Sequence, residues 1–318
     1  MKSTAKTNAV LVHGDALDLG AHVESNSAEL AYLDPPFNVG IAFRARADLV
    51  DLRENVPRAS VRGLVAYDDR WPSLEAYLSW LEPRLAAVRD LLSDAGTMWL
   101  HLDHRAVHEA KIVMDRLFGR KAFIGEVIWL PGNGSKARRG PGATHQTLLL
   151  YAKGHSFIWN GDDPALRAPF AATSLAMHFT NVDADGRAFR LRKINGKSYK
   201  YFADEGRALG SVWSDCPSMS ANTPLRKEST GYPTQKPLKL LERIVRASSN
   251  KGGLVLDPFC GSGTTLEAAA NLGRRAVGCD IGEIALATVE KRLHITRISA
   301  RKSADKTPIV KRKATSRK

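Results

Sequence analysis

A strand, a glycine turn and a helix between residues 252 and 280 constrain the fold of this chain more than any other feature. Leu254-Val255-Leu256 is a short apolar strand, and the Gly261-Ser262-Gly263 turn after it opens a helix near Thr264. A second strand, from Arg275 to Asp280, ends in an acid. This order is typical of a doubly wound α/β sheet, in which backbone N–H groups of such a turn approach a ligand.

The position of Asp280 indicates a nucleoside ligand. It lies about twenty residues after the glycines, where nucleotide-binding folds place a carboxylate that accepts the ribose hydroxyls. A dinucleotide site would begin in the same way. However, Leu266 stands where the third glycine of G-x-G-x-x-G is required, which disfavours NAD and FAD.

The second informative run is Asp34-Pro35-Pro36-Phe37, which follows the apolar segment Leu30 to Leu33. Because neither proline has a backbone N–H, the carbonyls of Asp34 and Pro35 have few local donors and need outside ones, which the Asp34 carboxylate can also accept. An exocyclic NH2 of adenine or cytosine supplies two hydrogens, and accepting both would aim the nitrogen lone pair at an electrophile. Phe37 offers an apolar face for a base taken out of the duplex. A tight turn with a buried phenylalanine explains the tetrapeptide equally well on its own.

Three further runs accompany these two. They are His13-Gly14-Asp15-Ala16-Leu17, Leu148 to Lys153, and Tyr232-Pro233-Thr234-Gln235-Lys236-Pro237-Leu238. Together the five runs resemble the β-class DNA amino-methyltransferases, in which the catalytic run comes first, then a target-recognition region, then the S-adenosyl-L-methionine (AdoMet) run. The resemblance covers about residues 8–293.

The resemblance implies the residues of the site. Asp34, Pro35, Pro36 and Phe37 form the catalytic motif, and AdoMet is the cofactor, with S-adenosyl-L-homocysteine as its product. The run at 13–17 contacts the adenine ring of AdoMet, and the run at 232–238 covers its methionine end. The residues expected at the cofactor are Asp15, Ala16, Gln235, Lys236, Pro237, Asp257, Phe259, Gly261, Ser262, Gly263, Thr264 and Asp280.

The fold that the resemblance implies is α/β, a seven-stranded, doubly wound, Rossmann-like sheet in circularly permuted order with an inserted target-recognition region. We expect four divisions: a catalytic half at 8–130, the target-recognition region at 131–231, an AdoMet-binding half at 232–293, and a basic tail at 294–318 with too few apolar residues to fold alone.

The activity it implies is methyl transfer to the exocyclic N6 of adenine in duplex DNA after base flipping. Within the family, Asp at position 34 usually accompanies adenine targets. The amino groups of adenine and cytosine present the same two hydrogens, so methyl transfer to N4 of cytosine remains an alternative. RNA and protein amide methylation are less favoured, and the absence of a Pro-Cys nucleophile run argues against cytosine C5 chemistry.

Between Pro131 and Tyr232 the α/β rhythm fails, and basic residues alternate with aromatic ones. This mixture suits contacts to phosphates and base edges. A β-rich subdomain with charged faces is a compatible alternative. The residues that we expect to contact DNA are Lys136, Arg138, Arg139, Arg190, Arg192 and Lys193.

Most of the net charge of +14 belongs to the C-terminus. Residues 291–318 contain 11 Lys or Arg and one acid, a charge of +10, so the rest of the chain carries +4. Nonspecific attraction to DNA phosphate and a solvated end that aids solubility both fit this tail.

Composition also excludes several classes of protein. No run of about 18 apolar residues predicts a membrane span, and no hydrophobic signal segment follows Met1-Lys2-Ser3-Thr4. We therefore expect a cytoplasmic, nucleoid-associated bacterial protein whose partner is double-stranded DNA. The sequence leaves a homodimer and a cognate restriction enzyme open.

Neither a disulfide framework nor a metal site is expected. The three cysteines are far apart in the sequence, and His101, His104 and His108 lack cysteine or carboxylate partners at a fixed ligand spacing.

The remaining regular elements follow from hydrophobic periodicity. We expect strands at 9–12, 96–102 and 123–130, helices at 74–92 and 107–118, and a long loop over residues 38–70.

Overall fold

The computed structural model describes residues 8–44, 64–132, 134, 137–219 and 227–299. The chain forms two compact units. The larger consists of Met1–Ile158 with Ser211–Lys318, and the smaller is Trp159–Gly210.

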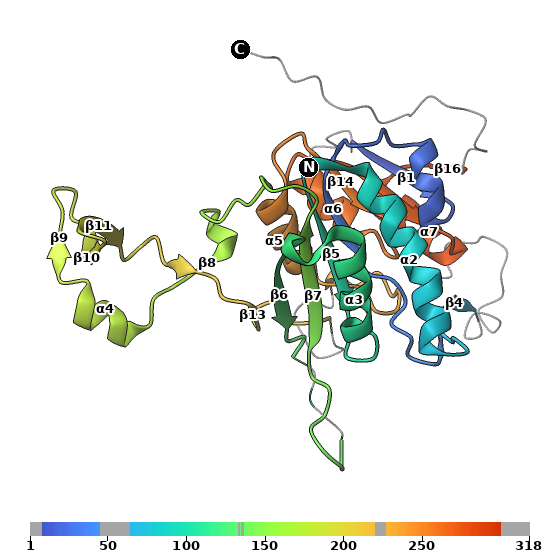
Figure 1. Cartoon of the computed structure of the whole chain (residues 1–318), viewed down its shortest axis with the longest axis horizontal. Coiled ribbons are helices and arrows are strands. Elements are labelled where there is room, and N and C mark those ends of the chain that lie inside the picture. The colour runs from blue at the N-terminus through green and yellow to red at the C-terminus, as the bar shows by residue number, and fades with distance from the viewer. Residues whose placement is uncertain (1–7, 45–63, 133, 135–136, 220–226, 300–318) are drawn as a thin grey trace. The chain divides into compact units, whose positions relative to one another are not determined.

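The larger unit is built on one sheet, which in the described part of the chain has the strand order β13-β6-β7-β5-β2-β14-β15-β1-β16 (Figure 1). Neighbouring strands are parallel except that β7 runs antiparallel to both β5 and β6. The strands are β1 (Ala9–His13), β2 (Ala28–Leu33), β5 (Leu92–Leu102), β6 (Phe123–Trp129), β7 (Gln146–Ala152), β13 (Val212–Trp213), β14 (Leu254–Asp257), β15 (Arg275–Asp280) and β16 (Arg297–Ser299).

This mostly parallel α/β sheet confirms the predicted fold class. The seven longer strands correspond to the predicted seven-stranded core, and the described residues add the short strands β13 and β16 at its two edges. These two strands contain two and three residues, too few to show an alternating pattern in the sequence.

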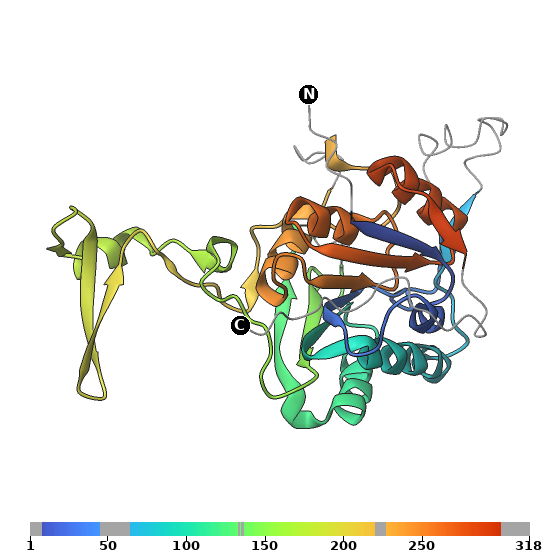
Figure 2. The same ribbon diagram turned by 90° about the horizontal axis from the view of Figure 1, so that it is seen from above.

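Helices cover both faces of the sheet, with α2 and α3 on one side and α5, α6 and α7 on the other (Figure 2). They are α2 (Leu74–Leu91), α3 (Val107–Phe118), α5 (Leu238–Ser248), α6 (Thr264–Asn271) and α7 (Glu283–Leu293). The 3-10 turn η1 (Ala16–Ala21) connects β1 to β2, and η3 (Arg120–Ala122) connects α3 to β6. Because the helices that follow the adjacent strands β2 and β14 lie on opposite faces, the sheet has its topological switch point there, where ligands bind in open α/β sheets.

Helix α2 shows how the sequence sets this packing. The hydroxyl of Ser73 caps its start by accepting the N–H of Ala76 at 3.2 Å. Tyr77, Leu81 and Leu85 recur every four residues and are fully buried in the core beneath the sheet. On the opposite face, Trp99 of β5 donates its indole N–H to Ser248 of α5 at 2.9 Å.

The prediction of a long loop over residues 38–70 is wrong near both of its ends, where two short strands form. Strand β3 (Ala42–Arg44) pairs antiparallel with β4 (Val65–Asp68), and Phe43 stacks on Tyr67 with 4.8 Å between ring centres. Strands this short show no period in a sequence, so only their pairing reveals them. Residues 45–63 lie outside the described residues.

The smaller unit contains two small sheets, with the orders β11-β10-β9 and β12-β8. Its elements are η4 (Pro164–Leu166), β8 (Arg167–Ala168), α4 (Ala172–His178), β9 (Asn181–Val182), β10 (Ala188–Ile194), β11 (Lys197–Phe202) and β12 (Arg207–Ala208). Asn195 and Gly196 connect β10 to β11 with φ of 49° and 79°, as a two-residue hairpin turn requires. Between Ala188 and Phe202 there are five Lys or Arg and no acid.

The predicted divisions at 8–130, 131–231, 232–293 and 294–318 stay predictions. Strands β7 and β13, within the predicted target-recognition region, belong to the central sheet, and the separate unit occupies only Trp159–Gly210 of it. Most of the basic tail, residues 300–318, lies outside the described residues. In the described ranges, no helix has the length and apolar character needed to cross a membrane.

Candidate active site

A cleft of about 970 Å³ opens at the carboxyl ends of the central strands of the larger unit. It collects nearly all of the residues predicted for catalysis and cofactor binding. Those that line it are Asp15, Ala16, Asp34, Pro35, Pro36, Phe37, Gln235, Lys236, Asp257, Phe259, Gly261, Ser262, Thr264 and Asp280. Pro237 and Gly263 are absent from the lining, because they form the N-caps of α5 and α6.

Strand β2 divides this cleft into two halves. The glycine-turn half lies beyond the ends of β14, β15 and β1, and its residues are Asp15, Asp257, Phe259, Gly261 and Asp280. The aromatic half lies beyond β5, β7 and β6, and it is lined by Trp129, Pro131 and Gln146 together with Tyr32 of β2. Asp34 and Phe37 follow β2 and therefore stand between the two halves.

The glycine turn is fixed by the acid at the end of β15. The carboxylate of Asp280 accepts the N–H of Gly261 at 2.9 Å and the N–H of Gly282 at 2.8 Å. Gly261 has a φ of 49°, and a Cβ there would lie 3.2 Å from the Tyr232 ring. Burial raises the pKa of Asp280, and these N–H groups partly oppose it. Because residue 261 is a glycine, the turn leaves space beside the Tyr232 ring that any side chain at this position would fill.

A buried acid lies beneath the turn. Asp257 is 3% exposed, and burial raises its pKa to about 7, although Thr265 and the Phe259 N–H donate to it. Trp80 lies 5.8 Å from the ring of Phe259. Carboxylates beside aromatic rings suit a ligand that carries a positive charge and a flat ring, and AdoMet has both. The residues present therefore fit the predicted cofactor.

Asp15 has a partner that the sequence did not predict. Its carboxylate caps η1 by accepting the N–H of Leu17 and pairs with Arg84 of α2 at 2.5 Å. The guanidinium of Arg84 lies 4.4 Å from the centre of the Trp80 ring system. This contact ties the start of η1 to α2 across the floor of the glycine-turn half.

A largely buried ion pair in the cleft joins Asp34 to Lys236. The Lys236 ammonium donates to both carboxylate oxygens, at 2.7 and 2.5 Å, and lies 4.9 Å from the centre of the Phe37 ring. The two side chains are 8% and 17% exposed for Lys236 and Asp34. Burial raises the pKa of Asp34, and Lys236 opposes the rise. The sequence predicted Lys236 at the cofactor and gave no sign of this ion pair.

Asp69 holds the catalytic loop, and sequence reasoning missed it. This fully buried carboxylate accepts the N–H groups of Phe37, Asn38 and Val39 at 3.0, 2.7 and 3.1 Å. Burial raises the pKa of Asp69, whereas the three backbone donors lower it. Since three successive donors converge on one group, the loop after Asp34 is pre-organised.

The aromatic half is supported by a buried histidine. His101 contacts the Tyr32 hydroxyl through Nδ1 at 2.7 Å, and its ring lies 5.8 Å from Phe37 and 5.5 Å from Trp129. Sequence reasoning did not predict this buried position for His101.

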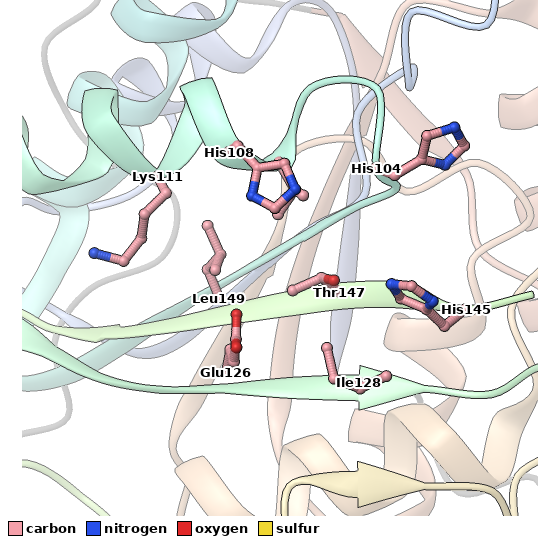
Figure 3. Close-up of a pocket in the computed structure, with 9 residues that line it drawn as sticks. His104, His108, Lys111, Glu126, Ile128, His145, Thr147 and Leu149 are labelled. Atoms are coloured by element: carbon pink, nitrogen blue, oxygen red, sulfur yellow. The ribbon is translucent and has the colours of Figure 1, made fainter. Parts of the chain in front are cut away.

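The other two histidines lie elsewhere. His104 and His108, with His145, line a separate cavity of about 220 Å³ between α3 and strands β6 and β7 (Figure 3). Within the described ranges, no three His, Cys, Asp or Glu side chains are arranged to hold a metal ion.

The predicted DNA-contacting residues fall in different surroundings. Arg138, Arg139, Arg192 and Lys193 are exposed, and Lys136 lies outside the described residues. The guanidinium of Arg190 instead lies 5.0 to 5.7 Å from three ring centres, those of Phe170, Phe179 and Tyr201. Whether these residues contact DNA stays a prediction.

Comparison with known proteins decides the family. A family model described as "DNA methylase", for N6 and N4 methyltransferases, matches residues 28–291, a stretch that contains both the catalytic run and the glycine turn. The chain belongs to this family. The predicted resemblance to DNA amino-methyltransferases is thereby confirmed.

Two relatives show how far the similarity extends. The type II methyltransferase M.EcaI of Enterobacter cloacae is 31% identical over 321 residues, which cover 86% of this chain and 66% of M.EcaI. The DNA adenine methyltransferase YhdJ of Escherichia coli (strain K12) is 27% identical over 273 residues, covering 85% of this chain and 78% of YhdJ.

Solved structures share the fold. The PvuII DNA methyltransferase, described as cytosine-N4-specific, has a TM-score of 0.54 at 15% identity and covers 90% of each chain. The protein M1.HpyAVI, solved as a complex with SAM (AdoMet), has a TM-score of 0.52 at 18% identity, and the match covers 90% of this chain and 100% of the other.

Proposed function

We propose that the protein transfers a methyl group from AdoMet to the exocyclic N6 of adenine in duplex DNA, after the base has been flipped into the cleft. One observation carries this proposal. A nitrogen that bears N–H groups already lies beside Asp34 and Phe37, because the Lys236 ammonium donates to both oxygens of that carboxylate. The Asp34 carboxylate thus already accepts N–H donors, and each of its oxygens keeps a second lone pair for the amino group of a base.

The glycine-turn half holds the cofactor in this proposal. Asp280 accepts the ribose hydroxyls, the turn at Gly261 leaves space for close approach, and Phe259 lies against the cofactor's flat surfaces. AdoMet, when bound, supplies an activated methyl group whose bond to sulfur breaks with both electrons going to sulfur, which gives S-adenosyl-L-homocysteine.

The chain's own residues act on the amino group. Asp34 accepts one of its N–H bonds and the Pro35 carbonyl accepts the other, so that the nitrogen lone pair points toward the glycine-turn half. The nitrogen gains a bond to carbon and then loses one proton, which the Asp34 carboxylate accepts and passes to water. Lys236 keeps Asp34 ionised until then, because the ammonium favours the charged form of a buried acid.

The enclosed position of Asp34 requires the target base to leave the duplex. Asp34 is largely enclosed, and an amino group within a base stack cannot reach it. Phe37 then stacks on the extruded base, which is worth roughly 1–3 kcal/mol.

Adenine is favoured over cytosine by two observations. Residue 34 is an aspartate, and the relative YhdJ is named a DNA adenine methyltransferase. N4 of cytosine is the second candidate, since its amino group presents the same two hydrogens to Asp34 and Pro35.

The partners of the protein are part of the proposal. M.EcaI is named a type II methyltransferase, which supports a role beside a cognate restriction enzyme. We place the protein in the bacterial cytoplasm on nucleoid DNA, where the basic hairpin of β10 and β11 and the basic tail attract phosphate. Size-exclusion chromatography with light scattering tests for a homodimer.

The test offers isotope-labelled AdoMet to the protein together with duplex DNA, structured RNA or protein extract, followed by mass spectrometry of the nucleosides. We expect label in N6-methyladenine from duplex DNA, and none with Asp34→Ala. Label only in N4-methylcytosine overturns the choice of base, and label only in RNA or protein overturns the choice of substrate.

A further inference from the structure

The aromatic half of the cleft has no role in holding the cofactor. In the proposed function, the cofactor residues come from β14, β15 and β1, on one side of β2. The aromatic half lies on the other side of β2, beyond β5, β7 and β6. Because Asp34 stands between the two halves, a base whose amino group reaches Asp34 must place its ring in the aromatic half.

Strand register puts four side chains of this region on one face of the sheet. Tyr32 pairs with Trp99, two residues before His101 on β5, so Tyr32 and His101 share a face. His101 pairs with Leu148, two residues after Gln146 on β7, and Gln146 pairs directly with Trp129 on β6. The row therefore runs Tyr32, His101, Gln146, Trp129 across four adjacent strands.

Two buried atoms of this row have no partner except each other. Among the described residues, His101 Nε2 and Gln146 Oε1 have no hydrogen-bond partner outside the pair, and the Gln146 side chain acts on His101 as a hydrogen-bond partner. The pKa of His101 lies well below its usual range because of burial and the nearby Lys236 ammonium, while Gln146 opposes the shift. The imidazole is therefore neutral. If the Tyr32 hydroxyl donates to Nδ1, the ring proton is on Nε2 and available to Gln146 Oε1.

Asp103, an acid that also lines the cleft, already has hydrogen-bond partners. Asp103 pairs with Arg105 and accepts its backbone N–H at 2.9 Å, so its oxygens are occupied at the start of α3. Gln146 is thus the carboxamide of the aromatic half that has capacity for a ligand. Its NH2 can donate to a ligand in the cleft that Gln146 lines, and such a neutral hydrogen bond contributes roughly 0.5–1.5 kcal/mol.

We propose that Gln146, oriented by His101, hydrogen-bonds a ring nitrogen of the target base next to the amino group and so helps to select the base. With Oε1 turned toward His101, the carboxamide NH2 faces the cleft as a donor. Adenine offers N1 and N7 as acceptors on either side of its amino group, and cytosine offers N3. This inference rests on the proposed function, because it assigns the ring contact of the same base.

The test uses duplexes that carry the methylation site mapped in the labelling experiment, with adenine, 1-deazaadenine or 7-deazaadenine at the target. Each deaza base keeps the amino group and lacks one ring acceptor. The wild-type protein should lose roughly 10-fold or more in kcat/KM on one of the two analogues. Gln146→Leu should lose a similar factor on adenine and nothing further on that same analogue.

A second variant and a control variant distinguish the loss of one contact from a loss of folding. Gln146→Glu has the same size but no NH2 donor, so it should match Gln146→Leu. Thr147→Val changes the next residue, whose side chain lies on the opposite face of β7, and should keep the wild-type preference between adenine and the analogues. All variants should bind AdoMet within twofold of wild type, since the glycine-turn half is untouched.

Two results overturn the inference. In the first, the Gln146 variants lose as much on each analogue as the wild type does, which means that Gln146 does not contact the missing nitrogen. In the second, the wild type uses both analogues as well as adenine. A wild-type protein that methylates no DNA overturns the proposed function instead, so the two failures are distinguishable.

Discussion

The two halves of the cleft solve different recognition problems with different chemistry. The glycine-turn half relies on backbone N–H groups, a glycine at positive φ and the acids Asp257 and Asp280. The aromatic half relies on side chains from the separate strands β2, β5, β6 and β7, with His101 behind them. Most residues of the glycine-turn half come from one chain segment, 257–280, to which Asp15 is added, whereas those of the aromatic half come from strands far apart in the sequence.

This difference gives each half its own measurable signature. Changes in the glycine-turn half should weaken AdoMet binding, and changes at Asp34 or in the aromatic half should slow transfer while AdoMet binding persists. A single variant that changes both AdoMet affinity and the rate of transfer would contradict this division of the cleft.

The largest effect is expected for Asp34→Ala. Transfer should fall by about 1000-fold or more, because the amino group loses its charged acceptor. AdoMet affinity, measured by calorimetry, should stay within a few-fold of wild type. If a folded Asp34→Ala protein no longer bound AdoMet, Asp34 would belong to the cofactor site.

Lys236 sharpens the comparison, because the sequence placed it at the cofactor and the structure pairs it with Asp34. Lys236→Met should lower kcat by about 10- to 100-fold at pH 7 without changing AdoMet affinity. Removing the ammonium raises the pKa of Asp34 further, so the acidic limb of the pH–rate profile should move to higher pH.

Lys236→Arg, which keeps the charge, should recover part of the rate and return the limb toward its wild-type position. An unmoved pH profile with weakened AdoMet binding in Lys236→Met would return this lysine to the cofactor.

Substitutions in the glycine-turn half should act through AdoMet affinity alone. Asp280→Ala should weaken AdoMet binding by about tenfold or more, since a carboxylate shared by two hydroxyls contributes roughly 1.5–3 kcal/mol. Gly261→Val should do worse, because a side chain there meets the Tyr232 ring. Calorimetry measures both, and wild-type affinity in either variant would mean that the turn is not the binding loop.

The smallest effect concerns the buried acid of the same half. Because the pKa of Asp257 is raised to about 7 in the folded protein, the native state binds a proton that the unfolded chain releases above about pH 4. The folded protein therefore loses stability as the pH rises from about 4 to about 7, and this group adds little further change above that. Asp257→Asn should raise the melting temperature by a few degrees at pH 8 and hardly at all at pH 4. Equal shifts at both pH values would contradict the assignment.

The sequence revealed the glycine-turn half more fully than the aromatic half, for a physical reason. Asp257, Gly261 and Asp280 lie within one strand–turn–helix–strand segment, where local spacing determines their geometry. The fold class followed from the same local rules. Nothing in the sequence indicated the strands that are too short to show a period, which are β13 and β16 at the sheet edges and the separate β3–β4 pair.

The aromatic half could not be predicted, since it depends on strand order. Lys236 lies 202 residues from Asp34, and Gln146 meets His101 only because β7 inserts antiparallel between β5 and β6. Asp69 likewise reaches the Phe37 loop across 32 residues. The sequence shows only an acid after a short run of mainly apolar residues, and its burial appears in the structure alone.

A crystal structure with a stable AdoMet analogue, in which an amine replaces the sulfonium methyl, tests the division of the cleft most directly. We predict that the analogue's adenosine lies between Asp280 and Phe259, with Tyr32, Trp129 and Gln146 untouched by it. An adenosine placed against Trp129 and Gln146 instead would contradict the assignment of the two halves.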